Sequence, residues 1–68
     1  MKYVYTESGC HKCEELKTQL RKEGIMFVER HASRIKALGD AADREALIVA
    51  SMQNMELPVA FDFETTDD

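Results

Sequence analysis

Short runs of strand-forming residues occur at three places along the chain. Lys2–Tyr5 contains β-branched and aromatic residues and is followed by the turn-forming stretch Thr6–Gly9. Ile25–Glu29 again has strand-forming residues, and its apolar side chains fall on both faces, which predicts a strand with little exposed surface. Alternation in Val59–Phe63 places its valine and both phenylalanines on one face. The pattern therefore predicts three short strands.

A helical repeat begins at the first cysteine. Between positions 10 and 23 apolar residues recur at helical spacing among charged neighbours, namely Cys13, Leu16 and Leu20. Gly24 follows at the point where a left-handed residue would end the helix. A helix of about three turns between two strands fits a right-handed crossover that joins parallel neighbours.

A second helix is predicted over Ala41–Met52. Asp40 is a suitable N-cap, with Asp43 three residues later, and the apolar residues that share one face are Ala42, Ala46, Val49 and Ala50. Asn54 can then adopt the left-handed conformation that turns the chain. Between Arg30 and Gly39 two readings stay open: either Ser33 caps a short helix through Leu38 that Gly39 ends, or the stretch is an ordered loop.

These elements predict an α/β domain over residues 1–63, in the order strand, helix, strand, the open stretch, helix and strand. The last five residues, 64–68, include no apolar residue and are expected to form a disordered acidic tail. A chain of 68 residues has room for one domain with little spare stability, so Met26, Met52 and Met55 are expected to fill its core. The sequence contains neither a long apolar run nor a secretion signal, which predicts a cytoplasmic protein that does not bind membranes.

Charge is distributed unevenly along the chain. The net charge is −4, but residues 1–38 carry eight Lys/Arg against five Asp/Glu (+3), and residues 39–68 carry one Arg against eight Asp/Glu (−7). An acidic chain without a basic stripe argues against nucleic-acid binding. If the third strand is an edge, the nearby acids Asp62, Glu64, Asp67 and Asp68 oppose strand-to-strand association, so we expect mostly monomer.

The two cysteines are the strongest candidates for chemistry. Cys10 lies at the predicted start of a helix, where unpaired N–H groups and the helix dipole favour a thiolate, and Cys13 lies one turn further in. This placement predicts that Cys10 is a nucleophile and that Cys13 resolves the mixed disulfide. Lys12, and His11 when protonated, add positive charge beside the thiolate.

The first 29 residues resemble the glutaredoxin family. The resemblance rests on Tyr5-Thr6, Cys10-His11-Lys12-Cys13, Lys17, Leu20, Gly24-Ile25, Phe27 and Glu29, and Leu57-Pro58-Val59 resembles the cis-proline segment of the same family. It implies a thioredoxin-like α/β fold, that is, a small mixed sheet with the first strand at its centre and flanking helices. It also implies a dithiol-disulfide oxidoreductase or electron donor, with Tyr5 supporting the site. It also implies that Pro58 is cis and that the backbone of Leu57 pairs with an extended thiol substrate. Lys17 matches the family pattern, but a solvated position with Glu14 as a weak partner explains it equally well.

Three departures from the family pattern change the expectations. Glutaredoxins usually carry a lysine that meets a glutathione carboxylate at the position of Glu7. His11-Lys12 replaces the usual Pro-Tyr, and the family's final strand and helix have no counterpart after Phe63. We therefore expect weak glutathione binding, and a substrate disulfide in a protein or a small thiol. A protein partner, as for the redoxins associated with ribonucleotide reductase, is an equally natural reading. The reductant would be glutathione or a thioredoxin-reductase-type enzyme.

The alternative function is a non-catalytic interaction or metal-binding module with a regulatory Cys-x-x-Cys. A zinc site would require Cys10, His11, Cys13 and His31. Adjacent Cys10 and His11 are poorly placed to share one tetrahedral ion, and no second ligand pair follows. We therefore expect no metal and no cofactor, apart from glutathione as a candidate co-substrate.

Overall fold

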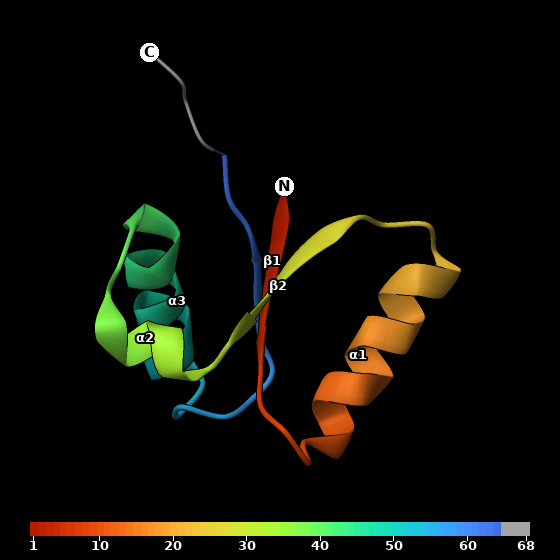
Figure 1. The fold of residues 1–68 in the computed structure, drawn as a ribbon, viewed down its shortest axis with the longest axis horizontal. Helices are drawn as coiled ribbons and strands as arrows, with labels where there is room; N and C mark the ends of the chain where they lie inside the picture. Colours follow the sequence, from red (N-terminus) through yellow and green to blue (C-terminus); the bar gives the residue numbers. More distant parts are fainter. Residues whose placement is uncertain (65–68) are drawn as a thin grey trace.

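Three strands and three helices form a small mixed α/β domain in the computed structural model, which describes residues 1–64 (Figure 1). The strands are β1 (Lys2–Thr6), β2 (Phe27–His31) and β3 (Val59–Asp62), and the helices are α1 (His11–Lys22), α2 (Ser33–Ala37) and α3 (Ala41–Met52). Positions 65–68 of the predicted acidic tail lie outside the described residues. None of the helices described is long and apolar enough to cross a membrane.

The first strand is central, as predicted. The sheet order is β2-β1-β3, with β1 parallel to β2 and antiparallel to β3. Helix α1 is the crossover between the parallel strands and covers one face of the sheet, and α2 and α3 lie on the other (Figure 1). Since Tyr5 pairs with Val59, the start of β3 lies beside the end of β1. The loops that follow β1 and precede β3 therefore meet at one end of the sheet.

Two predicted helices are confirmed with their caps. Cys10 is the N-cap of α1, and its Sγ accepts a hydrogen bond from the amide of Cys13. Gly24 follows the end of this helix with φ of 70°. Asp40 caps α3 by accepting a bond from the amide of Asp43 at 2.9 Å.

The second strand begins two residues later than predicted. The amide of Ile25 donates to the carbonyl of Leu20 at 2.9 Å and so completes the end of α1 instead of entering the sheet. Pairing with β1 starts at Phe27, opposite Lys2. Ile25 and Met26 are left exposed, so the expectation of little exposed surface is wrong for this segment.

The stretch that sequence left open contains the short helix α2. Its N-cap is Ala32, without a side-chain bond, so Ser33 is not the cap. Instead the amide and hydroxyl of Ser33 both bond to Nδ1 of His31. The helix ends at Leu38, which is itself left-handed with φ of 50°, and not at Gly39.

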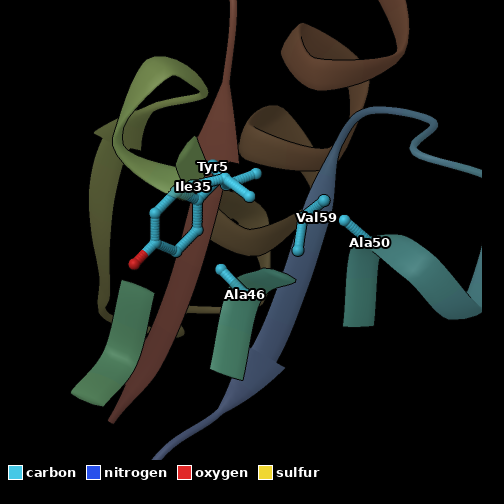
Figure 2. Close-up of a cluster of buried hydrophobic side chains, with 5 residues drawn as sticks. All are labelled: Tyr5, Ile35, Ala46, Ala50 and Val59. Atoms are coloured by element: carbon cyan, nitrogen blue, oxygen red, sulfur yellow. The ribbon is translucent and has the colours of Figure 1, made fainter. Parts of the chain in front are cut away.

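Small side chains let α3 approach the sheet closely. The core cluster consists of Tyr5, Ile35, Ala46, Ala50 and Val59 (Figure 2). Three methionines expected in the core are instead exposed: Met26 by 79%, Met52 by 81% and Met55 by 51%. The alanines already occupy the face of α3 that meets the sheet, which leaves no gap there for a long side chain.

A buried carboxylate links the sheet to its helical layer. Asp43 is fully buried; it accepts hydrogen bonds from the Tyr5 hydroxyl at 2.7 Å and from the guanidinium groups of Arg30 and Arg34 at 2.9 and 3.1 Å. Burial by itself would raise the pKa of Asp43, but the bonds from Tyr5, Arg34 and Arg30 outweigh it and hold that pKa well below its ordinary range. Burial and the neighbouring Asp43 raise the pKa of Tyr5 to about 12.

Asp43→Asn is expected to destabilise the domain severely, because it leaves two arginines facing a neutral group. Breaking a buried ion pair costs about 3–5 kcal/mol, comparable to the whole stability of so small a domain. Urea denaturation of this variant, with the exposed Asp62→Asn as control, measures the loss. An Asp43→Asn protein as stable as the control would contradict the structural role of Asp43.

Lowering the pH should also remove the stabilisation that ionised Asp43 provides. The pKa of Asp43 is lower in the folded than in the unfolded chain, so its contribution is complete above the unfolded value, about 4, and declines as pH falls below it. The free energy of unfolding measured from pH 7 to pH 2 should therefore fall below about pH 4. A flat profile through this range would count against the ionised state of Asp43.

Candidate functional site

The two cysteines form a disulfide across the first turn of α1, with their Cα atoms 5.2 Å apart. A tight turn after β1 places them there: the amide of Cys10 donates to the carbonyl of Glu7, and Gly9 has φ of 78°. The positive φ favours glycine at this position. The turn therefore brings Cys10 to the N-terminus of α1, where its sulfur accepts a hydrogen bond from the amide of Cys13 at 3.2 Å.

The two sulfurs differ in burial. Cys13 is completely buried on the face of α1 that meets the sheet, whereas Cys10 is only partly buried. After reduction, the Cys13 amide and the helix dipole would both stabilise a thiolate on Cys10. This difference in access agrees with the predicted division between an attacking and a resolving thiol.

His11 and Lys12 lie on the exposed side of the same turn. Nε2 of His11 pairs with Glu15 at 2.8 Å, and both side chains are largely in solvent. Lys12 is also exposed. Charges in such positions are screened by water and salt, so their effect on a nearby sulfur is small.

Tyr5, which the sequence assigned to the site, lies in the core. Its ring packs on the side of the sheet that α2 and α3 cover, opposite α1, and its hydroxyl donates to Asp43 (Figure 2). The structure does not bring Tyr5 to the disulfide. Its contribution is to hold the strand that ends at the cysteine loop.

Leu57 and Pro58 lie at the same end of the sheet as the cysteine loop. The bond between them is cis, and the Pro58 carbonyl accepts a hydrogen bond from the side-chain amide of Gln53 at 2.9 Å. The next residue, Val59, pairs with Tyr5 at the end of β1. The topology therefore brings this segment to the end of the sheet where the disulfide lies.

A cleft of about 560 Å³ adjoins this segment. Its walls include Glu7 from the cysteine loop, His31 at the end of β2, Lys36 from α2, and the apolar residues Ile35, Met55 and Leu57. An apolar floor with charged groups at the rim suits an extended peptide better than a small polar molecule. Sequence reasoning did not identify this cleft, because its walls come from four separate parts of the chain.

A second, polar cleft of about 340 Å³ lies on the α1 side of the cysteine loop, and its walls include Thr6, Glu7, Ser8, Glu14, Lys17 and Glu29. Only 8% of Lys17 is exposed here, so the solvated position, one of the two readings that the sequence left open, is wrong. Its Nζ lies 2.8 Å from Glu29 on β2 and 3.0 Å from Glu14. Its spacing from Cys13 and Leu20 places it on the apolar face of α1, which was a signal for burial in the sequence.

The second carboxylate of this cluster is tied to the sheet. Glu29 also accepts a hydrogen bond from the Thr6 hydroxyl at 2.7 Å. The bonds from Lys17 and Thr6 lower the pKa of Glu29, and the bonds to Glu29 and Glu14 raise the pKa of Lys17. Both groups therefore stay charged at neutral pH.

No group of three or more His, Cys, Asp or Glu side chains within residues 1–64 is arranged to hold a metal ion. Of the four zinc ligands considered from the sequence, Cys10 and Cys13 are joined to each other and His11 is paired with Glu15. His31 bonds to Ser33.

Comparison with known proteins identifies no relative: no protein-family model, no curated protein and no solved structure matches this chain. The function must therefore be inferred from the disulfide, its two unequal sulfurs and the clefts beside it.

Proposed function

We propose that this protein is a thiol-disulfide oxidoreductase of the glutaredoxin type, with a thioredoxin-like fold, that reduces disulfides in protein substrates. The observation that carries the proposal is the Cys10–Cys13 disulfide at the first turn of α1, with one sulfur accessible and the other buried. A disulfide that only stabilises the fold gains nothing from a position at a helix N-terminus, whereas an attacking thiolate is stabilised there.

Reduction of a substrate begins with the Cys10 thiolate. It attacks one sulfur of the substrate disulfide, a bond forms between Cys10 and that sulfur, and the other substrate sulfur leaves as a thiolate and takes up a proton. Cys13 then loses its proton and attacks Cys10. The second substrate thiol is released, and the protein is left with the Cys10–Cys13 disulfide.

Each cycle moves two electrons from the protein dithiol to the substrate. The dithiol is restored by an external thiol reductant, either glutathione or a thioredoxin-reductase-type enzyme, which supplies two electrons and is itself oxidised. No metal or organic cofactor takes part in these steps.

The apolar cleft beside Leu57 and Pro58 favours a protein substrate. A peptide strand on this segment would place its own disulfide beside Cys10, with apolar side chains against Ile35 and Met55. Glu7 at the rim puts negative charge where a carboxylate ligand such as glutathione would need a cation.

Reduction of insulin disulfides tests the activity directly. The wild-type protein should accelerate it, and Cys10→Ser should abolish the acceleration because no accessible thiolate remains. Supplying electrons from glutathione in one series and from a thioredoxin-reductase system in another identifies the reductant. A wild-type protein that is inactive with both, and with dithiothreitol, would instead favour the non-catalytic interaction module.

The division of roles predicts unequal reactivity of the reduced thiols. Iodoacetamide at neutral pH should label Cys10 well before Cys13, because Cys10 is the more exposed sulfur and lies at the helix start. In Cys13→Ser, mixed disulfides with substrate should accumulate on Cys10, as mass spectrometry of the trapped complex would reveal. Equal labelling of both thiols at the rate of free cysteine would refute the assigned roles.

Glutathione should bind weakly, and Glu7→Lys should strengthen its binding. Replacing an anion with a cation at the rim of the cleft reverses the local charge toward the glutathione carboxylates. Calorimetry on the oxidised protein with S-methylglutathione, whose blocked sulfur cannot reduce the disulfide, measures the change, with Glu23→Lys after the end of α1 as a control of equal charge. Tight binding by the wild type that Glu7→Lys leaves unaltered would contradict the role of Glu7.

A further inference from the structure

Lys17 is a charged side chain in a buried position, which requires an explanation. A lysine ammonium is rarely removed from water unless it is paired. Lys17 is paired twice, with Glu29 at 2.8 Å and with Glu14 at 3.0 Å, and only 8% of its surface remains exposed. The domain therefore holds a fixed positive charge between α1 and the sheet.

This charge lies on the same face of α1 as the cysteine pair. Cys13 precedes Lys17 by four residues, and Leu20 follows it by three; all three are buried. Long side chains of a helix lean toward its N-terminus, so the stem of Lys17 extends over the turn that contains Cys13. Glu14, which directly follows Cys13, holds the ammonium from that side.

The two carboxylates that hold Lys17 come from different elements, Glu14 from α1 and Glu29 from β2. Glu29 lies on β2, and its carboxylate is also bonded to Thr6, the last residue of β1 before the loop. The polar cleft that contains these groups also includes Ser8, two residues before Cys10. The cluster thus joins α1, β2 and the last residue of β1 before the cysteine loop.

We propose that Lys17 is a positioning residue for the dithiol: its ammonium, held by Glu29 and Glu14, supports the thiolate form of the cysteine pair once the disulfide is reduced. The inference rests on the proposed function for its catalytic meaning, because a thiolate is the form that attacks. Thiol reactivity is then controlled by the buried Lys17 and not by the exposed side chains of His11 and Lys12.

Lys17 acts as a fixed charge and not as a proton acceptor. The bonds to Glu29 and Glu14 keep the ammonium protonated, and Glu29 stays ionised for the same reason. A group that does not titrate near neutral pH cannot take the proton of Cys13. It can still change the energy of a nearby thiolate through its charge.

Other charged groups also face the dithiol or the polar cleft. They are His11, Lys12 and Glu15 on the outer side of α1, Glu7 in the loop, and Arg30 and His31 on β2. Arg30 is engaged by Asp40 and Asp43. All of these groups are unchanged when Lys17 alone is substituted, so a comparison of variants at one pH isolates its contribution.

Four variants test the proposal. Lys17→Met removes the charge but keeps most of the stem, Lys17→Arg keeps the charge, and Glu29→Gln removes one carboxylate. Lys22→Met, at the exposed far end of the same helix, is the matched control for loss of one positive charge. Each reduced protein is alkylated with iodoacetamide from pH 4 to pH 10, and the rate at Cys10 is followed by peptide mass spectrometry.

The expected shifts have opposite signs. Lys17→Met leaves the negative charges of Glu14 and Glu29 uncompensated, so the pH midpoint of Cys10 alkylation should rise. At one pH unit below the wild-type midpoint, the alkylation rate should fall roughly three- to tenfold. Glu29→Gln should lower the midpoint and speed alkylation. Lys17→Arg should resemble the wild type, and Lys22→Met should leave the profile unchanged.

The redox equilibrium with glutathione gives a second readout that reports on both cysteines. Because Lys17→Met destabilises the thiolate, the equilibrium of this variant with glutathione should move toward the protein disulfide. Glu29→Gln should move the same equilibrium toward the protein dithiol. A purely structural role would weaken folding in both variants without opposite shifts in either readout.

Several results would overturn the proposal. Equal effects of Lys17→Met and Lys22→Met would mean that only overall charge matters, and failure of Lys17→Arg to restore the profile would exclude a charge effect. If Lys17→Met does not fold, Glu29→Gln decides the matter, because an unshifted profile in that variant excludes control by the pair. Alkylation needs no turnover, so a protein inactive toward insulin would refute the proposed function while leaving this test intact.

Discussion

The hydrogen bond between the Tyr5 hydroxyl and the Asp43 carboxylate joins the central strand to the helical layer that covers it. Tyr5 lies in the middle of the sheet, between Arg30 on β2 and Val59 on β3, and its ring is the largest fully buried side chain. Asp43 receives further bonds from Arg30 and Arg34, so one carboxylate connects β1, β2, α2 and α3. In so small a core this polar contact fixes where the helices lie on the sheet.

The domain contains two clusters of paired charges, one on each side of the sheet. On the side of α2 and α3, Asp43 and its arginines join the sheet to the helices. On the side of α1, Lys17 and Glu29 are paired at 2.8 Å and border the polar cleft. Both clusters satisfy buried charges with hydrogen bonds.

The location of the site follows from the sheet topology. Because β2 is parallel to β1 and β3 is antiparallel to it, the end of β1, the end of β2 and the start of β3 lie at the same end of the sheet. The cysteine loop, His31 and the Leu57-Pro58 segment come from these three places. Glu7 and Leu57, which are far apart in the chain, therefore line one cleft at the end of the sheet where the cysteine loop lies.

Much of the local structure was determined by the sequence itself. Cys10 at a helix start, Asp40 as a cap, and Gly24 and Asn54 as left-handed residues are consequences of short-range backbone chemistry, and all four are found in the structure. These features depend on neighbours within one or two turns, which a sequence displays directly. The central position of the first strand was implied by the family resemblance, and the structure confirms it.

Tertiary structure decided the features that depend on distant partners. Lys17 is charged and would remain in water on an isolated helix, but Glu29 on the neighbouring strand makes its burial favourable. The family resemblance assigned Tyr5 to the site, yet its hydroxyl donates to Asp43, 38 residues away, in the core. Met52 was expected inside, but the alanines of α3 occupy the face of that helix that meets the sheet. Pairing and packing across the fold are set by which surfaces meet, and that is decided only when the whole chain is folded.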